Sequence, residues 1–350
     1  MRIKIGKRLI GEKKPCFIIA EAGVNHNGDI RLAKKLIDVA KKSGADAVKF
    51  QTFIAEKIVT KNASKANYQK RTTGTRESQY QMLKKLELAQ DDFLKLKKYA
   101  DSKNILFLST PYDKGSVEFL YKIGALAFKI SSADITNFPL LTTVAKKKIP
   151  IILSTGMSTI KEIRETVNLV KKEGNNQLVL LHCNFNYPAK IGEVNLRAMR
   201  SLEKNFKVPV GYSDHTEGIE VAVAAVALGA CVIEKHFTLN KNLAGPDHKA
   251  SIEPKEFKEM VRQIRNIEKA LGSEKKFPTK SEIPNRKVSR RSIVAVKNIK
   301  KGEIIVPDMI SVKRPGTGIP PSHFNEIIGK RVRIDIKVDT LVKWSQIFLK

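Results

Sequence analysis

Residues 208–236, VPVGYSDHTEGIEVAVAAVALGACVIEKH, contain one full period of the pattern that decides the fold. Two short apolar runs, at 208–212 and 230–234, flank a helical stretch at 217–228. Apolar runs without polar alternation are typical of parallel strands whose two faces are both buried. The segment therefore predicts a strand, a helix and a second strand in one parallel sheet.

The same alternation recurs on both sides of this segment. Strands are expected at 16–20, 45–50, 105–109, 126–130, 150–153, 177–181, 208–212 and 230–234. Helices are expected at 32–43, 114–123, 139–147, 160–173, 195–205, 217–228 and 254–271, and an insert at 54–103 has two helical stretches near its end. Eight strands with their helices are typical of a TIM (β/α)8 barrel, which makes the fold class α/β. A doubly wound open sheet is the rival fold, but no Gly-x-Gly-x-x-Gly follows the first strand.

The amino-acid composition changes after the last predicted helix. Glycine, serine, proline and charged residues at 272–286 indicate a linker. Short strands are expected at 292–296 and 304–306, among turns such as Pro315-Gly316. We therefore expect a TIM-barrel domain at 1–271 and a small, mostly β domain at 287–350.

Length and composition narrow the class of protein. A chain of 350 residues with 42% hydrophobic residues is typical of a globular protein. No apolar run approaches the roughly 20 residues that cross a bilayer, and residues 1–14 lack the apolar stretch of a signal peptide, so a cytoplasmic location without membrane contact is expected. Three cysteines, Cys16, Cys183 and Cys231, form no CxxC pair and are expected to be buried reduced thiols.

The formal net charge of +30 raises the question of nucleic-acid binding. The lysines are spread along predicted helical surfaces, as at Lys34 and Lys35, and no nucleic-acid-binding motif accompanies them. We therefore expect no nucleic-acid partner, whereas a positive field would attract an anionic substrate.

Histidines mark the expected active site. In a TIM barrel the active site forms at the C-terminal ends of the strands. Of six histidines, five follow such strand ends: His26, His182, His215, His236 and His248. Histidine is the commonest metal ligand, and His215 and His236, from adjacent strands, are the natural pair. Glu21, Asp214 or Glu234 could complete or orient the metal site.

Two lysines, Lys49 and Lys129, lie inside apolar strands. Lysine is almost never buried unless it is paired, so each could form an ion pair with a carboxylate such as Glu21 or Asp134. Alternatively, they could clamp an anion, or one could form a Schiff base. Hydroxyl and amide donors that suit phosphate and carboxylate groups surround the same rim: Thr110, Ser132, Ser154, Asn184 and Ser213. The residues indicate metal-assisted carbon–carbon bond chemistry on a phosphorylated acid, without naming the substrate.

Motifs along nearly the whole chain carry a more specific signal. In order, they are Glu21-Ala-Gly-Val-Asn-His-Asn-Gly28, Val48-Lys-Phe-Gln-Thr52, Leu108-Ser-Thr-Pro111, Ser154-Thr-Gly-Met157, Tyr212-Ser-Asp-His-Thr216, Glu234-Lys-His-Phe-Thr238 and Gly245-Pro-Asp-His248. Together they resemble the sialic acid synthase family (N-acetylneuraminate and N,N'-diacetyllegionaminate synthases). Lys300-Lys-Gly-Glu303 and Lys313-Arg-Pro-Gly316 resemble the C-terminal antifreeze-like (SAF) domain of that family.

The resemblance implies a role for each candidate residue. His215 and His236 would bind a divalent cation, manganese or magnesium, and Glu21 would be the catalytic acid or base. Phosphoenolpyruvate would be held by Lys49, Thr110, Lys129, Ser132, Ser154, Asn184 and Ser213. The amino sugar would face Glu21, Gln51, Tyr187 and Asp247, and Arg314 would reach it from the partner subunit of a domain-swapped homodimer.

The implied reaction is a condensation of phosphoenolpyruvate with N-acetylmannosamine or a close N-acetylated amino sugar. The metal would polarise the sugar's aldehyde, the enol carbon would attack it, and water addition with loss of phosphate would give a nine-carbon 2-keto acid. The alternative is an N,N'-diacetyllegionaminate synthase that uses 2,4-diacetamido-2,4,6-trideoxymannose. Many relatives carry Glu at the position of Asp134, and this difference leaves the identity of the sugar substrate undecided. The Gly-Pro-Asp-His loop speaks against the pseudaminic acid branch.

Two other classes of protein remain as competing predictions. A Schiff-base aldolase would also bury a lysine, and an ice- or glycan-binding protein could be built around the C-terminal domain. The polar rim of the barrel favours an enzyme over the binding protein.

Overall fold

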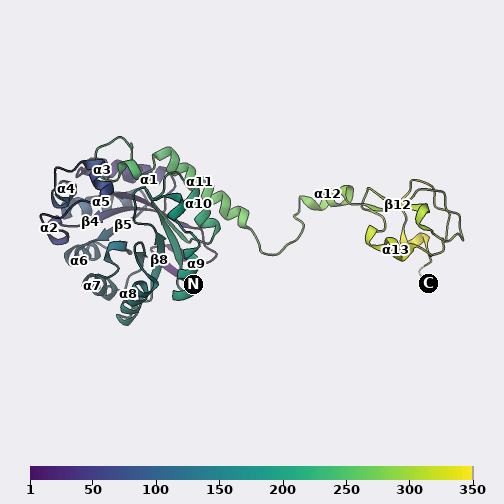
Figure 1. Ribbon diagram of the computed structural model, residues 1–350, viewed down its shortest axis with the longest axis horizontal. Coiled ribbons are helices and arrows are strands. Elements are labelled where there is room, and N and C mark those ends of the chain that lie inside the picture. The colour runs from purple at the N-terminus through teal and green to yellow at the C-terminus, as the bar shows by residue number, and fades with distance from the viewer. Residues whose placement is uncertain (349–350) are drawn as a thin grey trace. The chain divides into compact units, whose positions relative to one another are not determined.

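The computed structural model describes residues 1–348, and the chain divides into two compact units, Met1–Gly272 and Ser273–Lys350 (Figure 1). The NH2-terminal unit contains the eight predicted parallel strands. The COOH-terminal unit is the small domain. Within residues 1–348, no helix is both long and apolar enough to span a membrane.

Eight parallel strands form the sheet of the first unit. They are β3 (Phe17–Gly23), β4 (Ala47–Thr52), β5 (Leu106–Pro111), β6 (Phe128–Ile130), β7 (Ile151–Ser154), β8 (Leu178–Cys183), β9 (Val210–Asp214) and β10 (Val232–His236). Their order in the sheet is β5-β4-β3-β10-β9-β8-β7-β6, and the two outermost strands, β5 and β6, are neighbours that close the ring. The sheet is therefore a TIM-like barrel, which confirms the predicted fold class.

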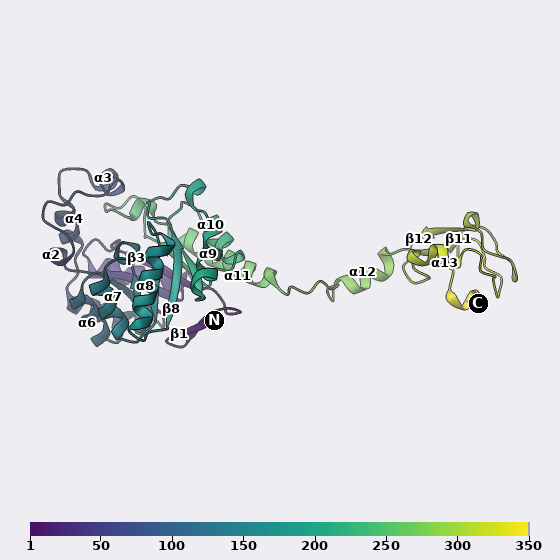
Figure 2. The same cartoon turned by 60° about the horizontal axis from the view of Figure 1, so that its bottom comes forward.

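Each strand is followed by helical sequence, as the alternation predicted. The helices after β3 and β5–β10 are α1 (Ile30–Lys42), α6 (Lys114–Lys122), α7 (Phe138–Lys146), α8 (Ile160–Lys172), α9 (Ala198–Phe206), α10 (Glu220–Ala227) and α11 (Pro254–Leu271). The insert after β4 holds four helices where two were expected: α2 (Ala55–Ile58), α3 (Asn67–Thr73), α4 (Gln79–Leu86) and α5 (Gln90–Ser102). In both views α2, α3 and α4 lie together on one side of the barrel unit (Figure 2).

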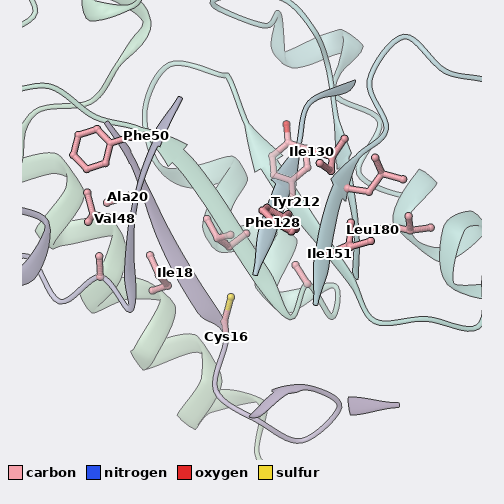
Figure 3. Close-up of a cluster of buried hydrophobic side chains, with 14 of the residues drawn as sticks. Cys16, Ile18, Ala20, Val48, Phe50, Phe128, Ile130, Ile151, Leu180 and Tyr212 are labelled. Carbon is pink, nitrogen blue, oxygen red and sulfur yellow. The ribbon is translucent and has the colours of Figure 1, made fainter. Parts of the chain in front are cut away.

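Alternate residues of each strand enter different apolar clusters. Along β3, Ile18 and Ala20 pack under the helices, and Figure 3 shows them near Val48. Phe17 and Ile19 belong instead to the cluster inside the barrel. Since both faces are buried, the strand reads as one continuous apolar run, which is why the sequence pattern identified it.

An N-terminal hairpin was not predicted. Its antiparallel strands are β1 (Arg2–Ile5) and β2 (Arg8–Gly11). Ile3, Ile5 and Ile10 are buried and join the cluster inside the barrel, so the hairpin closes the N-terminal end of the barrel. The alternation of polar and apolar residues in Arg2–Ile5 was the signal that could have identified it.

The second unit corrects two details of the sequence analysis. A helix, α12 (Glu282–Ser289), begins inside the segment predicted as a linker. The predicted strand at 304–306 is absent, because Ile304 forms only an isolated bridge with Arg331. The two strands of this unit are β11 (Ser292–Ala295) and β12 (Ile310–Lys313), and α13 (Phe324–Ile327) follows them.

If the hairpin closes the barrel, Ile5→Ala should lower the free energy of unfolding by about 2–5 kcal/mol, because it leaves a cavity in the barrel interior. Leu9→Ala is the matched control, since Leu9 lies in the same hairpin but is 46% exposed. Urea unfolding followed by circular dichroism measures both variants. If both variants lost the same small amount of unfolding free energy, the inference that the hairpin closes the barrel would be contradicted.

Candidate active site

The candidate site lies where the inward faces of the strands change from apolar to polar. On β3 the interior residues Phe17 and Ile19 are followed, two positions on, by Glu21. On β10, Val232 is followed by Glu234 in the same way. The inward face of each strand therefore brings polar side chains to the C-terminal end of the barrel, above an apolar interior that the hairpin closes from below.

A small cavity of about 30 Å³ occupies this end of the barrel. Most of the predicted site residues line it: Glu21, Lys49, Gln51, Thr110, Lys129, Ser132, Ser154, Tyr187, Ser213, His215 and His236. Glu234, Tyr112, Ser131, Cys183 and Phe185 also line it. The structure therefore brings together residues from all eight strands and their following loops.

Four buried charges of alternating sign cross the cavity. Lys49 Nζ lies 2.9 Å from Glu21 Oε2 and 3.7 Å from Glu234 Oε2. Lys129 Nζ lies 3.4 Å from Glu234 Oε1. All four side chains are at most 4% exposed. We call this set, Glu21, Lys49, Glu234 and Lys129, the charge chain; it links β3, β4, β10 and β6.

The charge chain changes the proton affinities of its members. Burial raises the pKa of Glu21 to about 7, and the nearby Glu234 adds to the shift although Lys49 opposes it. Burial alone would raise the pKa of Glu234, but the charges of Lys129 and Lys49 outweigh burial and lower it. Burial lowers the pKa of the Lys129 ammonium, and Lys49 reinforces that shift while Glu234 opposes it. Glu21 is therefore the carboxyl of the chain that titrates nearest to neutral pH.

Hydroxyl groups surround the two lysines. Lys49 Nζ donates to Thr110 Oγ1 at 3.1 Å, and Lys129 Nζ donates to Ser154 Oγ at 2.7 Å. Ser213 Oγ donates to Glu234 Oε1 at 3.0 Å. These contacts place two cations and several neutral donors on one rim, which suits an anion with both carboxylate and phosphate groups.

Ser132 and Asn184 complete the predicted set of donors. Ser132 Oγ accepts from the backbone N–H of Gly156 at 2.8 Å and lies 3.1 Å from Cys183 Sγ. Asn184 does not line the cavity: its Nδ2 donates to the carbonyl of Glu193 at 2.6 Å, while its Oδ1 is buried without a hydrogen-bond partner.

Two histidines meet edge to face at the cavity. The ring centroids of His215 and His236 are 5.4 Å apart. His215 Nδ1 lies 2.6 Å from the carbonyl of Asn184, which fixes the proton on Nδ1 and leaves Nε2 as an acceptor. Burial lowers the pKa of His215 to about 4 and that of His236 well below its ordinary value. Both rings are therefore neutral at pH 7, the form that ligates metal ions.

The histidine pair fits a divalent cation as two of its ligands. His236 Nδ1 is buried without a hydrogen-bond partner, and Asp247 Oδ2 lies 3.8 Å from it. Among the described residues, no group of three or more His, Cys, Asp or Glu side chains converges closely enough to hold an ion alone. The protein would supply two imidazoles, and oxygen ligands from substrate or water would have to complete the coordination.

The predicted sugar-facing residues divide between the two units. Gln51 Nε2 donates to Glu21 Oε1 at 3.2 Å, and Tyr187 stacks on His215 with the ring centroids 4.1 Å apart. Asp247 is buried beside His236, and burial raises its pKa to about 6. Arg314 belongs to the second unit, where it is exposed next to the end of β12.

Three histidines and Asp134 do not line the cavity, and hydrogen bonds to neighbouring segments hold them instead. His26 Nδ1 accepts from Gly28, His182 bonds to the carbonyl of Val194, and His248 bonds to Thr238 Oγ1. Asp134 does not pair with either lysine: its Oδ1 accepts from Asn137 Nδ2 at 2.9 Å, and its Oδ2 is buried without a partner. The partner that both lysines share is Glu234, a residue that the sequence suggested only as support for the metal.

Some lining residues were missed altogether. Tyr112, Cys183 and Phe185 line the cavity but were not assigned to the site. Cys183 follows the same inward alternation as Leu181, so its position relative to the strand end was a usable signal. Tyr112 and Phe185 lie in loops, for which strand periodicity gives no direction.

The barrel and its buried site are those of an enzyme that binds an anionic substrate. The chain matches the NeuB family over residues 36–276 and the SAF domain over residues 290–347. It is 49% identical to an N,N'-diacetyllegionaminic acid synthase of Legionella pneumophila, over 96% of both chains. It is 52% identical to the N,N'-diacetyllegionaminic acid synthase of Campylobacter jejuni, over 94% of this chain and 99% of the relative.

A solved structure agrees with these matches. The N-acetylneuraminic acid (sialic acid) synthetase of Leptospira borgpetersenii, in complex with citrate, superimposes with a TM-score of 0.72 at 38% identity. It covers 81% of this chain and 95% of its own. The chain therefore belongs to the NeuB family, as its motifs predicted, and it is an enzyme.

The raised pKa of Glu21 has a consequence for stability. Because the folded-state pKa is about 7 and the ordinary value is 4.5, the folded chain binds more protons than the unfolded chain between these pH values. The contribution of Glu21 to the free energy of unfolding therefore falls as pH rises from 4.5 to 7, by at most about 1.4 kcal/mol per pH unit.

Glu21→Gln should remove this pH dependence. Urea unfolding at pH 5, 6 and 7 should show wild type losing stability relative to the variant as pH rises. Glu12→Gln, at an exposed position, is the control and should follow wild type. A wild-type-minus-variant difference that stays constant or grows with pH would contradict a raised pKa for Glu21.

Proposed function

We propose that the chain condenses phosphoenolpyruvate with an N-acetylated amino sugar and releases phosphate and a nine-carbon 2-keto acid. The observation that carries the proposal is the charge chain of Glu21, Lys49, Glu234 and Lys129 beside two neutral histidines. Its two buried lysines and their hydroxyl neighbours match a ligand with carboxylate and phosphate groups. The relatives in the same family carry the names of sialic-acid-type synthases.

Different groups of site residues would bind the two substrates and transfer the proton. Lys49 and Lys129, with Thr110, Ser132, Ser154 and Ser213, would hold phosphoenolpyruvate, whereas Asn184 lies outside the cavity lining. Gln51, Tyr187 and Asp247 would hold the sugar, and Arg314 would reach it from a second subunit. Glu21, whose pKa lies near 7, would exchange the proton during water addition. Positioning both reactants in one buried cavity supplies much of the rate enhancement.

The proposed reaction forms one carbon–carbon bond, adds water and releases phosphate. The enol carbon of phosphoenolpyruvate forms a carbon–carbon bond with the aldehyde carbon of the open-chain sugar, and the aldehyde oxygen takes up a proton. Water adds to the resulting oxocarbenium carbon and loses a proton. The tetrahedral intermediate then collapses to the keto group as phosphate leaves.

We propose His215 and His236 as the protein ligands of a divalent cation, manganese or magnesium. The support is their neutral, adjacent rings and the unpartnered Nδ1 of His236. The ion would supply Lewis-acid polarisation of the aldehyde oxygen.

We also propose a cytoplasmic homodimer whose small domain serves the partner's barrel. Arg314 is exposed in its own unit, and no ion pair involves it among residues 1–348, which leaves its guanidinium free for a partner site.

Two sugars are the candidates. The 49% and 52% identities to N,N'-diacetyllegionaminic acid synthases favour 2,4-diacetamido-2,4,6-trideoxymannose, and the 38% identity to the sialic acid synthetase leaves N-acetylmannosamine as the second. Both sugars present an N-acetyl group and an aldehyde in the open-chain form.

The decisive experiment supplies the purified enzyme with phosphoenolpyruvate, manganese and each sugar in turn. Mass spectrometry should find a nine-carbon 2-keto acid and one phosphate released per product. The lowered pKa of Lys129 also fits a Schiff-base aldolase, so borohydride is added in parallel with each sugar. Covalent labelling of Lys129 or Lys49 without phosphate release would overturn the synthase proposal in favour of the aldolase.

Metal binding is tested separately from turnover. Manganese titrated into the chelator-treated protein should bind wild type, as measured by electron paramagnetic resonance of the free ion. His215→Ala and His236→Ala should each weaken that binding about ten-fold or more. His323→Gln is the control, because His323 is exposed and pairs with Glu326 in the second unit. Unchanged affinity in both alanine variants would contradict the proposed ligands.

A further inference from the structure

We propose that Tyr68, on helix α3 of the insert, is a specificity-determining residue: it closes the outer wall of the amino-sugar subsite and favours a sugar with an apolar distal end. The inference rests on the proposed condensation, whose sugar subsite it describes in more detail. A 6-deoxy sugar ends in a methyl group, whereas N-acetylmannosamine ends in a hydroxymethyl group.

Helix α3 is fixed at the mouth of the barrel. Thr72 Oγ1 donates to the carbonyl of Pro246 at 3.2 Å, so α3 contacts the loop that carries Asp247. The buried Lys65 anchors the same insert by donating to Thr73 Oγ1 at 2.9 Å. The insert therefore forms a defined part of the wall near the site.

Three rings form a row that leads outward from the histidine pair. Tyr187 stacks on His215 at 4.1 Å, and Tyr68 packs against Tyr187 at 4.8 Å. Tyr187 also meets His236 edge-on at 5.3 Å. Along this row, Tyr68 is the ring farthest from the reacting groups, and it is the one supplied by the insert rather than by a βα loop of the barrel.

Three tyrosines of this region, Tyr68, Tyr187 and Tyr112, are buried among acidic side chains that include Asp247. Burial, with the charge of Asp247, raises the pKa of Tyr68 and that of Tyr187. Burial also raises the pKa of Tyr112, to which Asp247 contributes as well. These three tyrosines are therefore neutral at pH 7 and would present uncharged rings and hydroxyls to a neutral, amide-bearing sugar.

The direction of the sugar follows from the reacting groups. In the proposed orientation, its aldehyde meets phosphoenolpyruvate beside Lys129 and the histidine pair, and its remaining carbons extend past Asp247 and Tyr187 to Tyr68. An aromatic face stabilises a methyl group by contact, but it leaves a hydroxyl placed against it without a hydrogen-bond partner. Discrimination of one such group in an apolar contact amounts to about ten- to 200-fold in kcat/KM.

The test compares kcat/KM for the two sugars, with 2,4-diacetamido-2,4-dideoxymannose, which differs from the 6-deoxy sugar only by its C6 hydroxyl, as the matched third substrate. Wild type should prefer 2,4-diacetamido-2,4,6-trideoxymannose over N-acetylmannosamine, and Tyr68→Ala should reduce that preference about ten-fold or more. The KM for phosphoenolpyruvate should stay within about two-fold of wild type, because the lysines that bind it are untouched. Tyr68→Phe keeps the ring and should keep most of the preference.

Tyr80→Ala is the matched control. Tyr80 lies in the same insert, on α4, where its hydroxyl donates to Glu56 at 2.9 Å. It should leave the ratio of the two sugars unchanged. Circular dichroism melting checks that each variant folds. If Tyr68→Ala does not fold, Tyr68→Phe still tests the inference.

Three results would overturn the inference. They are a wild-type preference for N-acetylmannosamine, an equal loss for both sugars in the Tyr68 variants, and a parallel rise in the KM for phosphoenolpyruvate. The last two would assign Tyr68 a purely structural role while leaving the condensation itself established. The absence of keto acid from both sugars with wild type would instead overturn the proposed function, and this inference with it.

Discussion

The structure depends on pairing four charges inside the barrel. A single buried lysine would be strongly destabilising, and Lys49 and Lys129 are tolerated because Glu234 lies between them and Glu21 lies beyond Lys49. These side chains come from β3, β4, β6 and β10, so the pairing exists only when the ring of strands is closed. Barrel closure and site assembly are therefore one event.

The barrel below this layer isolates the charges from water. The inward residues of the lower strands are apolar, and the N-terminal hairpin adds Ile3, Ile5 and Ile10 to them. The resulting low dielectric strengthens each ion pair and also raises the pKa of Glu21 to about 7. The hairpin thus adds to the apolar interior that lies beneath the charge chain.

The sequence predicted those parts of the fold that repeat. Parallel strands buried on both faces leave continuous apolar runs, and their C-terminal ends locate the polar residues, so all eight strands and most of the cavity lining could be predicted. Pairings between distant strands leave no local signal, which is why Glu234 was not identified as the shared partner of both lysines and Asp134 was offered instead. The hairpin, two helices of the insert, Tyr68 and Tyr112 belong to segments without the βα period, and their places depend on tertiary contacts.

The charge balance of the site bears on the proposed role of the two histidines beside the charge chain. The two lysines and two glutamates of the charge chain sum to zero when Glu21 is ionised, and Asp247 beside His236 adds a further carboxylate to the site. Phosphoenolpyruvate carries carboxylate and phosphate charges that this balance cannot neutralise alone. A divalent cation on two neutral imidazoles would add positive charge without adding a protein anion, whereas a third carboxylate ligand would cancel half of it.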